Sequence, residues 1–300
     1  MPEELRRSRR AGIGLRTAAL WSSVHDLVQT QAAALDRPLR ILDLGGGTGE
    51  LAVPLAGLGP HVVESVTVVD PSPDALAALA RRAGESGIPD CVVALQGDAD
   101  TLAEVLPGRQ FDLVCCHGVL EFVDDPQASL RSLAAALAPG GALSLLVASR
   151  LAGVVHRALA GDFTGATAIL DTPDGRWGAG DPLPRRFDLP YLRVLVTAAG
   201  LHVQTWHGVR LLSELVPSAH VDTEQAQAAL LGLEERLAGH PADGVPLPDA
   251  ALLDHPDPAP VRGRQVATGE TGQSPADGLG GEAIDQQADT HLPTSAQALH

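Results

Sequence analysis

The stretch RILDLGGGTGE at residues 40–50 constrains the fold more than any other part of the chain. A short apolar run ends near an acid, Asp43, and is followed by glycines at positions 45, 47 and 49 and then by leucines at helical spacing. Alternating glycines let a backbone turn sharply and approach a ligand without a Cβ in the way. A helix behind them presents free N–H groups to that ligand. The stretch therefore predicts a strand, a ligand-binding turn and a helix in direct succession.

The glycine spacing distinguishes between two kinds of nucleotide site. The dinucleotide pattern G-x-G-x-x-G fails, because Glu50 stands at the last position when the count begins at Gly45. What remains is D-x-G-x-G-x-G over 43–49, which resembles the first motif of the class I S-adenosylmethionine-dependent methyltransferases. That resemblance implies an α/β, Rossmann-like fold and S-adenosyl-L-methionine as the cofactor.

Strand and helix patterns alternate from residue 40 to residue 149, which favours a mostly parallel sheet with helices on both faces. We expect strands at 40–44, 65–70, 91–96, 111–117, 142–148 and 201–211, and helices at 12–35, 49–58, 73–83, 125–137, 151–160, 189–199 and 226–237. The resemblance also implies a seventh, antiparallel strand. The sole candidate, 260–268, is interrupted by Arg262, Gly263 and Arg264, so this strand is either weak or missing.

The domain organisation follows from these patterns and from composition. Residues 1–239 are predicted to form the methyltransferase domain, with 150–187 as an insertion that covers the substrate. Residues 240–300 are rich in Pro, Gly, Asp, Gln and Ala without periodicity, and are predicted to be a low-complexity, mostly disordered tail.

Charge and cysteine content limit the compartment and the partners. The formal net charge of −16 gives no global attraction for nucleic acid or anionic membranes, and no DNA partner is expected. No segment approaches the length of a membrane span. The three cysteines lack a C-x-x-C pair, and the apolar run after the arginines at 6–10 is a poor export signal. We expect a cytoplasmic protein with reduced thiols.

Five residues at the ends of the first two strands are candidates for cofactor binding. Asp43 is predicted to accept from the ammonium of the methionine moiety, although it could instead cap its own turn. Gly45, Gly46 and Gly47 would allow the close approach. Asp70 ends the second apolar strand, where an acid can accept from both ribose hydroxyls. Its alternative role as a helix N-cap is better filled by Ser72.

Two later strand ends supply further candidates. Asp98 and Ala99 follow the third strand, where a side-chain acceptor and a backbone N–H could meet the adenine. Asp98 could equally begin a helix with a favourable dipole. His117 ends the fourth strand at the carboxyl edge, where ligands bind in open α/β sheets. Whether it acts as a base or as a contact stays open, and a buried structural histidine is the alternative.

The chain further resembles the bacterial tRNA 5-carboxymethoxyuridine methyltransferases. The matching stretches are Gly14-Leu15-Arg16, Ala19-Leu20-Trp21, Leu42-Asp43, Gly45-Gly46-Gly47, His117 to Glu121, Asp125-Pro126, Pro139 to Leu145, His156, Ala160 to Phe163 and Gly208-Val209-Arg210. The resemblance implies that Arg16 contacts the cofactor carboxylate, that Gly45, Gly46, Asp70, Ala99 and His117 line the cofactor, and that Arg210 holds the carboxylate of the substrate. Without this resemblance, the sequence alone would favour solvated surface positions for both Arg16 and Arg210.

This resemblance implies methylation of the 5-carboxymethoxyuridine carboxylate in tRNA to a methyl ester, with the anticodon loop as partner. No catalytic base is needed, because the carboxylate is already ionised, and no metal site is expected. The arginines at 6–10, with Arg176, Arg185 and Arg186, could meet the RNA or be ordinary surface. The alternatives are a small-molecule O- or N-methyltransferase of specialised metabolism and a non-catalytic protein that binds the cofactor.

Overall fold

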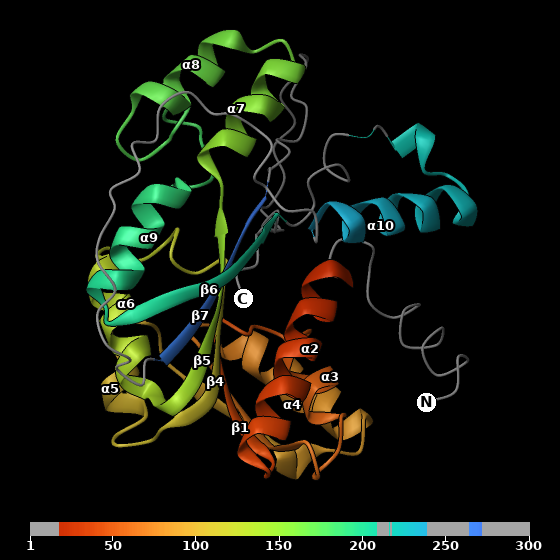
Figure 1. The fold of residues 1–300 in the computed structure, drawn as a ribbon, viewed down its shortest axis with the longest axis vertical. Helices are drawn as coiled ribbons and strands as arrows, with labels where there is room; N and C mark the ends of the chain where they lie inside the picture. Colours follow the sequence, from red (N-terminus) through yellow and green to blue (C-terminus); the bar gives the residue numbers. More distant parts are fainter. Residues whose placement is uncertain (1–17, 209–215, 217, 239–263, 272–300) are drawn as a thin grey trace.

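The computed structural model describes residues 18–208, 216, 218–238 and 264–271. These residues contain a seven-stranded sheet in the order β3-β2-β1-β4-β5-β7-β6. The strands are β1 (Leu39–Leu44), β2 (Val63–Asp70), β3 (Val92–Gln96), β4 (Phe111–His117), β5 (Leu137–Ala148), β6 (Leu201–Gly208) and β7 (Arg264–Thr271). Every strand pair is parallel, so all carboxyl ends meet at one edge, which lies towards the top of Figure 1. The predicted class of fold is confirmed.

Helices cover both faces of the sheet and build a separate core on each (Figure 1). One core contains side chains of α2 (Ala18–Leu35), α3 (Ala52–Ala56) and α4 (Pro73–Glu85), and the other those of α5 (Leu102–Val105), α6 (Pro126–Ala136) and α9 (Leu189–Ala198). Successive strand residues alternate between them: Ile41 joins the first core and Leu42 the second. The central strands are therefore apolar on both faces, as a parallel sheet requires.

Short caps keep the chain close to the carboxyl edge. The Ser72 Oγ accepts the Ala75 N–H at 3.2 Å, and Pro73 begins α4 directly behind it. Asp125 caps α6 in the same way through the N–H groups of residues 127 and 128. Proline is favoured at the first helical position because its missing N–H has no partner there. The predicted helices behind the second and fourth strands are thus confirmed.

Most expected bounds differ from the structure by one or two residues, but two predicted elements begin at clearly different positions. The helix expected at 49–58 is reduced to α3, because Gly49 has φ of +79° and cannot continue a right-handed helix. The strand expected at 142–148 begins at Leu137, with Gly140 at φ of +79° in an irregular stretch where the register against β4 shifts. Neither difference moves the carboxyl ends of the strands.

The seventh strand is present as β7, between β5 and β6, so the alternative in which the sheet lacks it is wrong. Its orientation also differs from the expectation, because β7 runs parallel to both neighbours. A parallel neighbour requires a crossover of a dozen or more residues. The chain between β6 and β7, which includes α10 (Glu224–Ala238), is long enough to supply it. The rest of the tail predicted as disordered lies outside the described residues.

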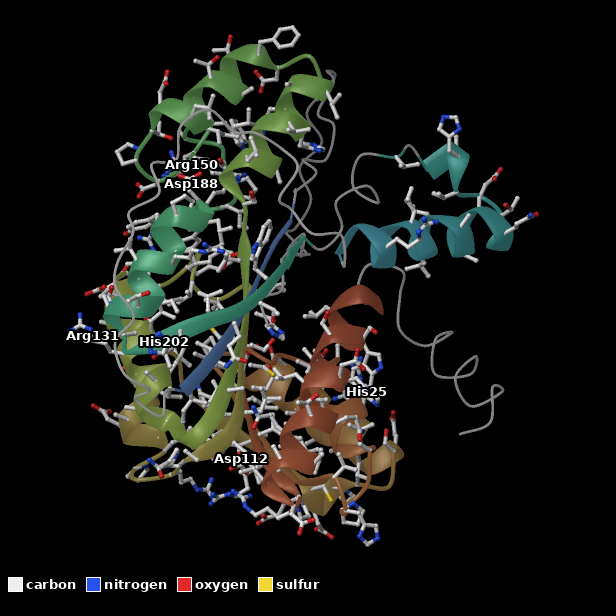
Figure 2. All side chains as sticks on the ribbon, in the orientation of Figure 1. His25, Asp112, Arg131, Arg150, Asp188 and His202 are labelled. Atoms are coloured by element: carbon white, nitrogen blue, oxygen red, sulfur yellow. The ribbon has the colours of Figure 1, made fainter. Side chains whose placement is uncertain are left out.

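The insertion contains α7 (Arg150–Leu159) and α8 (Phe163–Asp171), followed by turns up to residue 188. Both helices lie beyond the carboxyl ends of the strands (Figure 1). Arg150 holds the base of the insertion: its Nη1 donates to Thr172 O at 2.7 Å, and its Nε lies 2.9 Å from Asp188 Oδ2 (Figure 2). None of the helices described has the length and apolar character needed to cross a membrane.

Candidate cofactor site

The glycine loop is tied directly to the end of β2. The Gly47 N–H donates to Asp70 Oδ2 at 2.9 Å, and the Ser72 N–H donates to Asp70 Oδ1 at 2.9 Å. Asp70 is 8% exposed, so it stands at the boundary between the core and the edge of the sheet. A carboxylate has about four acceptor positions, and two backbone donors leave capacity for a ligand. Asp70 thus ends β2 beside the glycine loop, and it also binds that loop through Gly47.

Asp43 is a buried acid without a hydrogen bond on one oxygen. Its side chain is 2% exposed, and Oδ2 has no partner among the described residues. Burial, and then the nearby Asp70 carboxylate, raise the pKa of Asp43 from its ordinary 3.8 to about 7. A cation with N–H donors would supply both the charge and the hydrogen bond that this group lacks.

The glycines make room for the protein's own side chains. A Cβ at Gly46 would lie 2.4 Å from Asp43 Oδ2, and one at Gly45 would lie 2.4 Å from Val119 Cγ2. Gly45 and Gly47 also have backbone conformations in the left-handed region, with φ of +72° and +51°. The loop spacing therefore positions Asp43 and Val119 as much as it would allow a ligand to approach.

His117 ends β4 beside this loop, and its Nε2 lies 2.9 Å from Ser144 Oγ on β5. Burial lowers the pKa of the His117 imidazole from 6.5 to about 3. The ring is therefore neutral at physiological pH, and it is a poor base there. Of the two roles left open, this favours a contact over a base.

Asp98 and Ala99 follow β3 at the same edge, where the Gly97 N–H donates to Asp70 O at 3.2 Å. Asp98 Oδ1 accepts three local hydrogen bonds, from Asp100 N–H, Thr101 N–H and Thr101 Oγ–H. The Thr101 N–H, followed by its hydroxyl, holds the pKa of Asp98 below its usual range. This pattern favours the local structural alternative for the Asp98 side chain. Ala99 is 3% exposed.

Glu121 is a functional candidate that was not predicted, although an acid in the apolar run after His117 is a signal in the sequence. Its side chain is 1% exposed, and Oε1 accepts the Ala148 N–H from the end of β5 at 2.5 Å. In the described part of the chain Oε2 has no hydrogen-bond partner. Burial raises the pKa of Glu121 from 4.5 to about 7, although its backbone bonds, Arg185 and Arg186 oppose the shift.

Replacing Glu121 by Gln should change how stability depends on pH. The folded pKa of about 7 lies above the ordinary 4.5, so Glu121 contributes its full stability below pH 4.5 and loses it as the pH rises through 7. Glutamine has no such dependence and still presents an oxygen to Ala148. Relative to the wild type, the variant should gain up to about 3 kcal/mol between about pH 4.5 and about pH 8.

The free energy of unfolding, measured by urea denaturation at both pH values, checks this prediction. Glu104→Gln, at an exposed position on α5, is the control and should show no comparable trend. The contribution of Asp43 is common to the wild type and the variant and cancels. A stability difference between Glu121→Gln and wild type that does not vary with pH would show that the pKa of Glu121 is not raised by burial.

The predicted arginines are not all at a surface. Arg186 is 5% exposed and pairs with Asp181 through bonds of 2.6 and 3.1 Å, so it belongs neither to an RNA-facing patch nor to an ordinary surface. Arg185 is half-buried and donates to Val123 O at 2.8 Å. Arg16, Arg210 and the arginines at 6–10 lie outside the described residues.

The described groups fit a bound S-adenosylmethionine. Asp43 offers a buried, unpaired carboxyl oxygen to an ammonium, and Asp70 offers acceptor capacity to a ribose. The neutral His117 lies at the end of β4, which neighbours β1, and the backbone around Ala99 follows β3, which neighbours β2. In the described residues, no three His, Cys, Asp or Glu side chains are grouped so that they could hold a metal ion.

Comparisons with known proteins identify the family of the chain. The profile of a methyltransferase domain family matches residues 16–205. The tRNA 5-carboxymethoxyuridine methyltransferase of Escherichia coli (strain K12) is 31% identical over 222 residues, which are 74% of this chain and 80% of that protein. The ubiquinone biosynthesis O-methyltransferase of Xanthomonas euvesicatoria pv. vesicatoria (strain 85-10) is 36% identical over 122 residues, 41% of this chain and 48% of that protein.

Among solved structures, the plantazolicin methyltransferase BamL is 14% identical with a TM-score of 0.48, over 76% of this chain and 82% of that one. The assignment rests on the family profile and on the E. coli relative. The chain belongs to the methyltransferase domain family and is an S-adenosylmethionine-dependent methyltransferase. Within that class, it resembles the tRNA 5-carboxymethoxyuridine methyltransferases, as the sequence motifs predicted.

Proposed function

We propose that this methyltransferase converts the carboxylate of 5-carboxymethoxyuridine in tRNA to its methyl ester. The observation that carries the proposal is the extent of the similarity. The match to the tRNA enzyme covers 74% of this chain, whereas the match to the ubiquinone enzyme covers 41%. A short match of that kind can arise from a shared cofactor-binding half alone, and the longer match includes more of the chain.

The proposed cofactor contacts are Asp43 with the ammonium, Asp70 with the ribose, the Ala99 backbone and His117 with the adenosine, and Arg16 with the carboxylate. When bound, the cofactor supplies a methyl group on a sulfonium centre, which a carboxylate oxygen can attack in line. The protein positions that oxygen and excludes water around it. No base is required, which agrees with the low pKa of His117.

The charge of the acceptor must be met by a group other than His117, which stays neutral. The resemblance gives this role to Arg210, two residues beyond the end of β6. Arg210 would hold one carboxylate oxygen and leave the other free to attack. A guanidinium suits this task because its charge is permanent and its donors lie in a fixed fork.

Replacing Arg210 by Ala should raise the KM for tRNA by roughly 10- to 100-fold, the range for one charge-assisted contact, while cofactor affinity stays unchanged. Initial rates at varied tRNA concentration, with calorimetric titration of S-adenosylhomocysteine, check both parts. Arg236→Ala, an exposed arginine on α10, is the control for loss of one positive charge. Loss of cofactor binding in Arg210→Ala would refute its role at the acceptor.

A small-molecule acceptor is the second candidate, and one observation favours it. Arg185 and Arg186 make contacts within the protein, and α7 exposes Leu151, Val155 and Leu159. An insertion that presents aliphatic side chains suits an apolar acceptor better than a phosphate backbone. This candidate retains the proposed cofactor contacts.

Transfer assays separate the two candidates. Isotopically labelled methyl transfer should be seen with tRNA that carries carboxymethoxyuridine, and should be absent with the same tRNA lacking that modification. If the acceptor is a small molecule, we expect no transfer to either tRNA and transfer to a compound in a low-molecular-weight cell extract. A protein that binds S-adenosylhomocysteine and transfers to no acceptor would support the non-catalytic alternative.

A further inference from the structure

The loop between β4 and α6 connects several parts of the site. It begins directly behind His117, and its Val119 side chain fills the space beside Gly45. Its Glu121 accepts the Ala148 N–H at the end of β5. A displacement of this loop would therefore move both Val119, which adjoins the glycine loop, and His117 at the end of β4.

Arg185 of the insertion binds the same loop through its backbone carbonyls. Its Nη1 donates to Val123 O at 2.8 Å and to Leu120 O at 3.4 Å, and its Nη2 donates to Asp124 O at 3.5 Å. The planar guanidinium carries several donors at fixed angles and can satisfy neighbouring carbonyls of a turn at once. A shorter or uncharged side chain could not reproduce this set of contacts.

The position of Arg185 is itself fixed by the residues that follow it. Arg186 forms the buried ion pair with Asp181. The Phe187 N–H donates to Ala148 O at 2.8 Å, and Phe187 O accepts the Arg150 N–H at 3.0 Å. The loop, the end of β5 and residues 185–187 thus form a closed ring of contacts.

We propose that Arg185 is a positioning residue for the cofactor site. By holding the loop at 118–124, it keeps Val119 against Gly45 and His117 in place at the carboxyl edge. The inference rests on the cofactor placement given under the proposed function, and it makes cofactor affinity depend on a residue of the insertion. It also replaces the RNA-facing role considered for Arg185 from sequence.

The test compares Arg185→Ala, Arg185→Lys and Arg193→Ala in the full-length protein. Arg193 lies exposed on α9 and controls for the loss of one positive charge. Calorimetric titration with S-adenosylhomocysteine should give a Kd about tenfold higher for Arg185→Ala, a value close to wild type for Arg193→Ala, and partial recovery for Arg185→Lys. In transfer assays, the KM for the cofactor should rise more than kcat falls.

Each other outcome is informative. If the wild type binds S-adenosylhomocysteine and folded Arg185→Ala binds it equally well, the positioning role is wrong while the proposed function stands. A normal cofactor Kd with weakened tRNA binding would contradict the positioning role and would indicate that Arg185 contacts RNA. A wild type that binds no S-adenosylhomocysteine would overturn both the cofactor placement and the inference. A lower kcat with unchanged KM and Kd would indicate a purely structural residue and also contradict it.

Discussion

Replacing Asp70 by Ala should abolish measurable cofactor binding, with a loss of roughly 100-fold or more in affinity. Two effects combine in this variant. The Gly47 and Ser72 N–H groups lose their common acceptor, so the glycine loop loses its tie to β2. The proposed contacts to the ribose hydroxyls are removed as well. Calorimetric titration with S-adenosylhomocysteine measures the loss directly.

Asp74→Ala is the matched control, because Asp74 is an exposed acid in the first turn of the same helix, α4. It should bind the cofactor as the wild type does. A cofactor analogue that lacks the ribose hydroxyls separates the two effects. If Asp70 contacts the ribose, the analogue should bind the wild type more weakly than S-adenosylhomocysteine, and the difference should disappear in Asp70→Asn. Unchanged affinity in Asp70→Ala would show that the ribose assignment is wrong.

Replacing Gly46 by Ala should lower both cofactor affinity, by at least about tenfold, and stability, by about 1–3 kcal/mol. The new Cβ would lie 2.4 Å from Asp43 Oδ2 and 2.7 Å from Asp43 Cγ, and 3.0 Å from Val68 Cγ1. Asp43 is buried near the end of β1, so its carboxyl group cannot swing out without disturbing packed neighbours. The clash must therefore be relieved by moving the loop.

Gly84→Ala is the control, since a Cβ at this position in α4 meets nothing within 4 Å. It should stabilise the protein by about 0.5–1 kcal/mol through helix propensity and leave affinity unchanged. Adding Asp43→Ala to Gly46→Ala should recover part of the lost stability, because the clashing carboxyl is gone, but should not recover affinity. Wild-type affinity and stability in Gly46→Ala would show that the loop tolerates the added carbon.

The sequence was most informative where a local pattern decides local structure. Apolar runs that end in Asp43, Asp70 and His117 identified the strands and placed these side chains at one edge. The Ser72-Pro73 and Asp125-Pro126 pairs marked helix starts, because capping depends on neighbouring residues alone. The main candidates for the cofactor site followed from these two signals.

Contacts between distant segments were not predictable in the same way. Arg185 binds carbonyls from another loop, and although Asp181 lies only five residues from Arg186, the sequence does not indicate that this ion pair is buried. The role of Glu121 depends on the Ala148 N–H, which only the pairing of β4 with β5 brings within reach. The strand β7 was uncertain because its residues lack a continuous apolar run.

The glycine loop shows how a correct motif can have an incomplete explanation. The spacing of 45, 46 and 47 predicted the site, yet the space at Gly45 and Gly46 is taken by Val119 and Asp43. Asp43 belongs to the first strand, and Val119 to the loop that follows the fourth. Glycine is therefore also required at these positions for packing at the edge of the sheet.

Mass spectrometry of the nucleosides from treated tRNA is the decisive test of tRNA methylation by this protein. Purified protein is incubated with S-adenosylmethionine and tRNA that carries carboxymethoxyuridine, and the tRNA is digested with and without prior mild alkali. If the protein forms the methyl ester, that nucleoside should gain one methyl group, which depends on the protein and is lost in alkali. An unmethylated nucleoside, from a preparation that binds S-adenosylhomocysteine, or a methyl group stable to alkali, would contradict it.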